Sequence, residues 1–369
     1  MKKISSFEYG SLMWFVIRAS FVGITLANII SISKVDAWFS AIMALVLGLL
    51  PFIIFELIRK CSNKNIFEIN SSVFGKFGKF MNIILIVGSY IFALVVFADL
   101  TYFISSQFLY KTSLIFISAF FIVPLIYALI NGENAFSKTS LILFYITFFT
   151  VLFIDISLST GVSIDNIRPI MSGDNDIFKG AIIMIAYNVL PLCLLLAISK
   201  KNINGYSFKK SLWFYVLSMI TVVMVVFCTI SVYGINLSML LEFPEFHLLK
   251  KVSIGNFINK LEGILSMEWV VALFFLLLIT IYFIVTGIRN LFPIKKSTNN
   301  YSIIIICASL LIINTYTFMY NGSSNDFVTR EMLKIMYVVY FILPCITLIG
   351  LLFKIIQQQN YTGSNNYDH

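Results

Sequence analysis

Arg18 is the residue of this chain whose position most needs a chemical explanation. It lies well inside an apolar stretch, residues 7–32, which contains FVIRASFVGITLAN at Phe15–Asn28. Such a stretch is long enough to cross a membrane as a helix. A charged side chain deep in a bilayer costs at least about 2.5–3.5 kcal/mol on insertion scales, so it indicates a functional or structural role. We expect Arg18 to pair with Asp99 or Asp155; alternatives are that it replaces a coupling cation or touches a bound molecule.

The residues that follow Arg18 predict an interrupted helix, because small side chains gather there. A second apolar stretch, residues 177–198, carries Asn188 and Pro191 near its middle, and proline removes a backbone donor and clashes with the preceding turn. Interruptions at matching positions of two halves are the best sequence pointer to a transporter binding site. Glycine and proline also occur in ordinary membrane helices, which is the alternative interpretation.

Two such interruptions together predict a site for a zwitterion. Backbone N–H groups exposed after the first interruption favour a carboxylate. Carbonyls freed around residues 185–188 favour an ammonium group. Tyr90 and Leu94 share a helix face by their spacing, and Thr280 offers a small hydroxyl, although ordinary helix packing explains each of them equally well. The candidate ligand-binding residues are Ser20, Phe21, Val22, Gly23, Ile24, Tyr90, Leu94, Tyr187, Asn188 and Thr280.

The composition places these residues in a membrane protein. The 369 residues are 59% hydrophobic and 12% charged, with a mean hydropathy of +0.94. Soluble domains carry about 25% charged residues. The expected fold is an all-α integral membrane protein, a single polytopic domain over residues 1–369. The net charge of +9 resides in the loops and does not indicate a nucleic-acid partner.

The apolar stretches predict ten membrane spans, bounded by polar or turn-forming residues. An inverted repeat of five plus five spans follows, with broken helices one and six, repeat one at about 8–159, repeat two at about 177–357, and a short tail at 358–369. The predicted spans are residues 8–32, 37–58, 80–108, 112–131, 138–159, 177–198, 208–234, 262–289, 300–320 and 333–357.

The distribution of positive charge predicts the orientation. Most of the 26 Lys and Arg residues fall on the segments that share a side with the N-terminus. An excess of positive charge marks the cytoplasmic side, so both termini are expected to be cytoplasmic. Glu268, which stands early in the eighth span, is expected at the membrane interface.

One of the two long outer segments, between spans seven and eight, predicts a short amphipathic helix that begins after Pro244. It is either a lid over a cavity or a helix that rests passively on the lipid interface. Its apolar residues at near-helical spacing are Phe246, Leu249, Val252, Phe257 and Leu261.

The chain has few of the residues and motifs that commonly form catalytic or metal-binding sites. The only histidines are His247 and His369, and the five cysteines have no metal-binding or disulfide spacing. There is no nucleophile–base pair and no phosphate loop. We therefore expect neither an enzyme nor a bound cofactor or metal.

Several motifs resemble the B-subunit family of spore germinant receptors, within the amino acid–polyamine–organocation superfamily. The motifs keep their order over almost the entire chain: ISSFEYGSLMWF, FVGI followed by DAW, NSSVFGKFGK, NIRPIMSGDNDIFKGA and FPEFHLLKKVSIGNFINKLEGILSMEW. The resemblance implies the five-plus-five fold and a germinant sensor of the spore inner membrane. It also implies a small amino-acid-like ligand, contact with membrane lipid, and two partners, an A-type membrane subunit and a C-type lipoprotein.

The resemblance supports the predicted first break at residues 21–24, and it makes Pro244, Glu245, Glu262 and Trp269 family-like positions. Two features depart from the family pattern. Phe21 stands where a second glycine is common, which narrows the site, and Arg18 belongs to no family motif. A proton- or sodium-coupled transporter of amino acids or amines is the alternative function, although span eight offers only Thr280 for a coupling site and span five has no interior lysine.

Overall fold

The structure, a computed structural model, describes residues 3–19, 25–171, 176–251, 262–292, 296–320 and 331–364. Within these ranges, eight helices are long and apolar enough to cross a membrane. They confirm the predicted all-α membrane fold. The eight are Leu26–Cys61, Lys76–Gln107, Leu114–Asn131, Glu133–Leu158, Ile177–Ala197, Phe208–Leu240, Glu262–Leu291 and Met332–Gln357.

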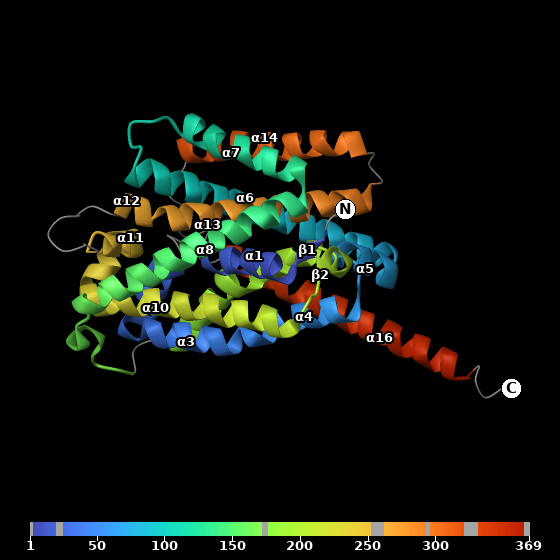
Figure 1. Cartoon of the computed structure of the whole chain (residues 1–369), viewed down its shortest axis with the longest axis horizontal. Helices are drawn as coiled ribbons and strands as arrows, with labels where there is room; N and C mark the ends of the chain where they lie inside the picture. The colour runs from blue at the N-terminus through green and yellow to red at the C-terminus, as the bar shows by residue number, and fades with distance from the viewer. Residues whose placement is uncertain are drawn as a thin grey trace.

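Each of the ten predicted spans contains helix, but some are divided into shorter pieces (Figure 1). The count of ten and the inverted repeat stay predictions. The elements of the first half are β1 (Ile4–Ser5), α1 (Ser6–Ala19), α2 (Leu26–Ser33), η2 (Lys34–Asp36), α3 (Ala37–Leu47), α4 (Leu49–Cys61), α5 (Ile66–Phe74), α6 (Lys76–Gln107), α7 (Leu114–Asn131), α8 (Glu133–Leu158), η3 (Ser159–Gly161) and η4 (Ile164–Ile167).

The second half begins with a helix that changes its type twice. It contains α9 (Ile177–Met184), the π-helix η5 (Ile185–Val189), the 3-10 helices η6 (Leu190–Ala197) and η7 (Lys200–Asn202), β2 (Ile203–Asn204), α10 (Phe208–Leu240), α11 (Pro244–Leu249), α12 (Glu262–Leu265), α13 (Met267–Leu291), α14 (Lys296–Tyr320), α15 (Met332–Tyr337), the π-helix η9 (Val338–Ile342) and α16 (Leu343–Ser364). Helix α16 therefore continues past residue 358, where the tail was predicted to begin.

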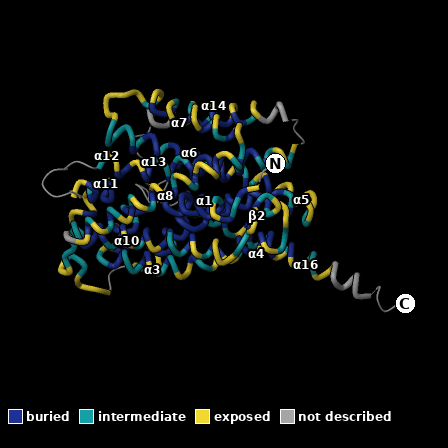
Figure 2. The backbone as a smooth tube through the Cα atoms, in the orientation of Figure 1, coloured by how far each residue is buried: buried dark blue, intermediate teal, exposed yellow. Residues whose placement is uncertain are grey.

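The centre of the bundle is α1, which is buried on nearly every side (Figure 2). It packs against α8, α10 and α13 and against η5 and η6 of the sixth span. A helix that is apolar around its whole circumference is suited to such a position. Gly10 allows the close approach to α10, since a Cβ atom there would lie 2.0 Å from the ring of Phe214.

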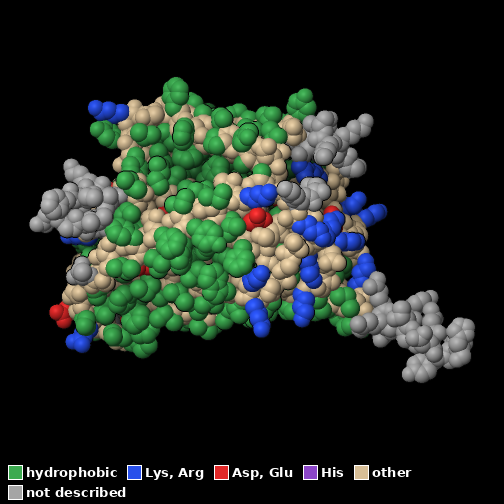
Figure 3. Space-filling view, viewed as in Figure 1, with side chains coloured by type: hydrophobic (Ala, Val, Ile, Leu, Met, Phe, Trp, Pro, Cys, Tyr) green, Lys and Arg blue, Asp and Glu red, His purple; other side chains and the backbone are tan. Residues whose placement is uncertain are grey.

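The N-terminus is joined to the segment that follows the sixth span. Ile4 and Ser5 pair in parallel with Ile203 and Asn204, and the Ser6 hydroxyl donates to the Gly205 carbonyl. On the face shown in Figure 3, Lys and Arg side chains gather at this end of the molecule. The middle of the same face is covered mainly by hydrophobic side chains, as expected for a surface in contact with lipid.

Helices α7 and α14 pack together at one side of the bundle, against α6 and α13 (Figure 1). Their outer faces expose large apolar side chains, among them Phe116, Phe120 and Ile305. This layer leaves the central helices, which carry the candidate site, shielded from lipid.

Candidate functional site

The predicted interruption of the sixth span lies where the sequence indicated. Residues 185–189 form a π-helix and residues 190–197 a 3-10 helix, with Pro191 in the first turn of the latter. Single π-helical turns frequently mark functional sites, because they widen the backbone and shift its hydrogen bonds. The segment is almost entirely buried: Tyr187 and Asn188 have no exposed surface.

Asn188 connects this segment to the end of α1. Its Nδ2 donates to the Ile17 carbonyl at 2.7 Å. Its Oδ1 is buried and accepts no hydrogen bond from any residue that the structure describes. An unsatisfied buried acceptor is costly, so it indicates a place for a donor that the described residues do not provide.

The predicted break after α1 lies outside the described residues. Ser20, Phe21, Val22, Gly23 and Ile24 belong to the gap between α1 and α2. The described parts on either side both contact the sixth span: α1 packs on η5 and η6, and α2 packs on α9. The structure therefore brings spans one and six together around this gap.

The other predicted ligand-binding residues do not all converge here. The Thr280 hydroxyl is buried and donates to the Leu276 carbonyl of its own helix at 2.7 Å. The Tyr90 hydroxyl donates to Ser309 of α14, away from spans one and six, and Leu94 is a half-buried packing residue. Only Tyr187 and Asn188 lie on the interrupted segment itself.

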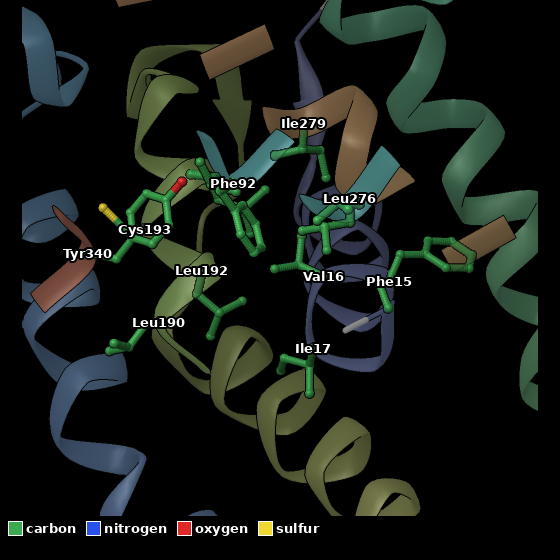
Figure 4. Close-up of a cluster of buried hydrophobic side chains, with 14 of the residues drawn as sticks. Phe15, Val16, Ile17, Phe92, Leu190, Leu192, Cys193, Leu276, Ile279 and Tyr340 are labelled. Atoms are coloured by element: carbon green, nitrogen blue, oxygen red, sulfur yellow. The ribbon is translucent and has the colours of Figure 1, made fainter. Parts of the chain in front are cut away.

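Apolar side chains fill the space beside this junction (Figure 4). Phe15, Val16 and Ile17 of α1 lie in one buried cluster with Phe92 of α6 and with residues of η6, α13 and η9. The sequence prediction missed η9, a π-helical turn in span ten. Its signal is Pro344, which removes a backbone donor two residues after the π-helix ends.

The structure corrects the expected partner of Arg18. Its Nε lies 2.7 Å from Glu268 Oε1 on α13, and its Nη1 donates to the Thr221 hydroxyl of α10 at 2.6 Å. Neither Asp99 nor Asp155 forms this ion pair. The side chains of Arg18 and Glu268 are only 5% and 1% exposed, so both are buried within the protein. The predicted position of Glu268 at the membrane interface stays a prediction. The ring of Trp14 also lies below the guanidinium, 4.9 Å from its Cζ.

Asp155 lies close to this ion pair without joining it, whereas Asp99 lies near Glu245. Asp155, on α8, lines the same small cavity as Arg18 and Glu268. Asp99, on α6, lies within electrostatic range of Glu245. One carboxylate oxygen of each aspartate is buried and has no hydrogen-bond partner among the described residues.

Helix α11 closes this cavity at the end of the bundle opposite the N-terminus (Figure 1). It begins at Pro244, as predicted, and five of its six residues are buried. Glu245, Leu248 and Leu249 face the cavity, and Trp269 completes the wall. The structure thus favours a lid over a helix that rests on lipid. The predicted positions Val252, Phe257 and Leu261 lie outside the described residues.

His247 is the titratable group of α11 that faces water. Partial burial and the nearby Lys250 ammonium lower the pKa of this imidazole from its ordinary value. Its backbone carbonyl accepts a hydrogen bond from the Tyr233 hydroxyl at 2.6 Å, which attaches α11 to α10.

A second, larger cavity of about 400 Å³ opens at the opposite end of the bundle. It lies between α5, the segment after η6, and the end of α13, and sequence reasoning did not find it. Charged and amide side chains dominate its walls: Glu68, Lys201, Asn202, Arg289 and Asn290. Glu133 lies beside it and accepts hydrogen bonds from Asn202 and Tyr282.

The bundle of apolar helices, with one span changing from α to π to 3-10 geometry at its centre, defines an integral membrane protein of transporter-like architecture. A crystal structure of a manganese transporter from Eremococcus coleocola, in complex with an aromatic bis-isothiourea substituted compound, has the same fold, with a TM-score of 0.54. The match covers 94% of this chain and 78% of that chain at 12% sequence identity.

The family is defined by the sequence. The model of the family described as spore germination protein, of the spore permease type, matches residues 3–326. The chain therefore belongs to the spore germination protein family, and the resemblance found in its motifs is confirmed. YfkT, a protein of Bacillus subtilis (strain 168) named for spore germination, is 23% identical over 305 residues, which cover 80% of this chain and 83% of YfkT.

Proposed function

We propose that this chain is the membrane-embedded subunit of a nutrient germinant receptor. It binds a small amino-acid-like molecule between spans one and six, and it passes the signal to partner subunits. Membership of the spore germination family supports this function, and the transporter-like fold supports a binding site at the interrupted helices.

Asn188 is the observation that carries the proposal. It lies in the π-helical turn, fixes the last turn of α1 through the Ile17 carbonyl, and keeps a buried acceptor oxygen without a partner among the described residues. An ammonium group of a ligand supplies the donors that this oxygen lacks. The carboxyl end of α1 also carries partial negative charge, which favours the same group.

The carboxylate of a zwitterionic ligand binds at the start of α2. This helix begins at Leu26, and its first backbone N–H groups carry partial positive charge that favours a carboxylate. The predicted residues Ser20–Ile24 belong to the segment between these two helix ends. An amino acid placed there is bound by charge at both ends.

The proposed location is the inner membrane of a spore, with both termini in the cytoplasm. The gathering of Lys and Arg at the end where the N-terminus lies supports this orientation (Figure 3). The proposed partners are an A-type membrane subunit and a C-type lipoprotein. Co-purification of both subunits with the tagged chain from spore membranes tests the assembly.

Asn188→Ala tests the site itself, with Asn314→Ala as the matched control. Asn314 is also buried, also donates through Nδ2, and also has an acceptor oxygen without a partner among the described residues, but it lies on α14. Spores that carry each variant are exposed to a panel of amino acids, and membrane abundance is measured beside germination. We expect Asn188→Ala at normal abundance to lose or change the response, and Asn314→Ala to retain it. An unchanged response in Asn188→Ala contradicts the proposed site.

A coupled transporter of amino acids or amines is the second candidate function. The observation that supports it is the fold, which the chain shares with a manganese transporter. A sensor only needs to bind its ligand more tightly in one of two conformations, by about 5.5 kcal/mol for a complete switch. A transporter must carry the ligand across. Uptake of labelled amino acid by proteoliposomes that contain the chain distinguishes the two: accumulation supports transport, and binding without uptake supports the receptor.

A further inference from the structure

The cavity beneath α11 is separate from the proposed germinant site and has a different chemistry. The cavity has a volume of about 10 Å³ available to the centre of a water molecule, which is room for about one water molecule or one ion of that size. Side chains of α1, α8, α10, α11 and α13 enclose it. Those that matter for its chemistry are Arg18, Asp155, Glu245, Glu268 and Trp269.

The charges around this cavity do not balance among the described residues. The carboxylates of Asp155 and Glu268 line it, each with one buried oxygen that has no hydrogen-bond partner among the described residues, and Arg18 is the one cation among the lining residues. Arg18 binds Oε1 of Glu268 and the Thr221 hydroxyl. Arg18 lies within electrostatic reach of Asp155 but forms its ion pair with Glu268, so these two carboxylates face one cation.

Two oxygen atoms show where the surplus of negative charge is concentrated. Oε2 of Glu268 belongs to a side chain that is 1% exposed, and no described residue donates a hydrogen bond to it. Oδ1 of Asp155 is also buried, and none of the described residues donates a hydrogen bond to it. A buried carboxylate oxygen requires a donor or a cation, because its hydration has been removed.

We propose that this cavity binds one small monovalent cation. Oε2 of Glu268 and Oδ1 of Asp155 are its ligands, and Arg18 holds Glu268 in place without occupying the cavity. The ion is either an alkali metal ion or an ammonium ion, since both have the size of water and a single positive charge. Among the described residues, no group of three or more His, Cys, Asp and Glu side chains is arranged to hold a metal ion, so the proposed site depends on two carboxylate oxygens.

The position of the cavity gives the cation a structural effect. Glu245, Leu248 and Leu249 belong to α11, so a bound cation draws α11 onto α8 and α13 through its charge. The outer lid is then held closed by the ion. This site requires neither the Asn188 junction nor any germinant, so it can be tested on the purified chain alone.

The experiment uses the full chain in detergent and follows tryptophan fluorescence. Trp269 lines the cavity and Trp14 lies below Arg18, so two of the four tryptophans report on it. Sodium, potassium and ammonium chloride are titrated separately against tetraethylammonium chloride at constant ionic strength and constant pH. The bulky ion keeps screening constant but does not fit the cavity.

We expect a saturable change in fluorescence and in thermal midpoint with at least one of the small cations and none with tetraethylammonium. Asp155→Asn is the principal variant, because Asp155 takes no part in the Arg18 ion pair. It should raise the half-saturating cation concentration about tenfold or more. Asp165→Asn, an exposed aspartate on η4, is the matched control and should leave this concentration unchanged.

Two results overturn the proposal. If the small cations and tetraethylammonium act alike, no ion enters the cavity. If the midpoint depends on pH but on no cation, the carboxylates hold protons and not a metal or ammonium ion. The proposal is supported if saturation by the small cation is lost in Asp155→Asn and kept in Asp165→Asn. The cation with the lowest half-saturating concentration is then the one that the cavity prefers.

Discussion

The ion pair between Arg18 and Glu268 gives the sharpest test of the structure. Its nitrogen–oxygen distance is 2.7 Å and both side chains are almost fully buried. Removing one partner of such a pair leaves the other charge buried without compensation, at a cost of about 3–5 kcal/mol. Arg18→Leu should therefore strongly lower the thermal midpoint and the membrane abundance of the chain.

The double variant Arg18→Leu with Glu268→Leu separates charge from packing. Replacing both members of a buried pair by apolar residues is often neutral or stabilising, by about 1–4 kcal/mol. Thr221 does not become unsatisfied, because its hydroxyl also donates to the Ser218 carbonyl. We therefore expect the double variant to recover most of the stability that Arg18→Leu loses.

The assay is thermal unfolding in detergent, followed by tryptophan fluorescence, with a double-mutant cycle over the two positions. Lys334→Met is the control, because Lys334 and Glu331 form a pair of similar length whose side chains are 65% and 51% exposed. Such exposed pairs contribute about 0–1 kcal/mol. The argument is refuted if Arg18→Leu unfolds like the wild type, or if the double variant is no more stable than the single one.

Three further predictions concern other parts of the chain. Asn188→Leu should be less stable than Asn188→Ala, because overpacking a fully buried position costs about 1–3 kcal/mol; thermal midpoints compare the two. Gly10→Ala should lower the midpoint, since its Cβ would lie 2.0 Å from the Phe214 ring, whereas Gly263→Ala, with its nearest neighbour at 3.8 Å, should not. The folded-state pKa of His247 lies below its ordinary value of 6.5, so stability should fall as the pH drops below about 6.5; His247→Gln should reduce this dependence in a pH series of midpoints, and an unchanged series would contradict the pKa shift.

The elements that depend on local sequence were predictable. Long apolar stretches have one stable structure in a bilayer, because only helices satisfy their own backbone there without an edge. Pro191 acts on the turn that precedes it, so the change of helix type at residues 185–197 could be placed from the sequence. Pro244 marked the start of α11 for a similar reason.

The pairing of charges was not predictable from spacing. Arg18 and Glu268 are 250 positions apart in the sequence, and their contact depends on how α1 and α13 are rotated and staggered. Glu268 is the second residue of α13, which indicated an interfacial position. The structure buries it because α11 covers that end of the helix, and nothing in the apolar pattern of span eight encodes this covering.

The predicted ligand-binding role of Thr280 shows that a hydroxyl group inside a membrane helix is weak evidence for a binding site. Thr280 is in mid-span, where a polar side chain attracts a functional interpretation, yet its hydroxyl donates to a carbonyl four residues earlier in its own helix. Threonine satisfies itself in this way in many helices. Asn188 differs, because its Nδ2 donates to the Ile17 carbonyl of another helix, while its Oδ1 is an acceptor that no described residue reaches with a donor.

The last turn of α1 joins the two sites. The Ile17 carbonyl accepts the hydrogen bond from Asn188, and the next residue along the chain, Arg18, holds Glu268 and contacts the cavity beneath α11. The Ile17 carbonyl and the Arg18 backbone N–H belong to one peptide plane, so a movement of this turn displaces both bonds together. If the proposed ligand at the Asn188 junction and the proposed cation beneath α11 both act on this turn, each changes the affinity for the other by the same factor, because linkage is reciprocal.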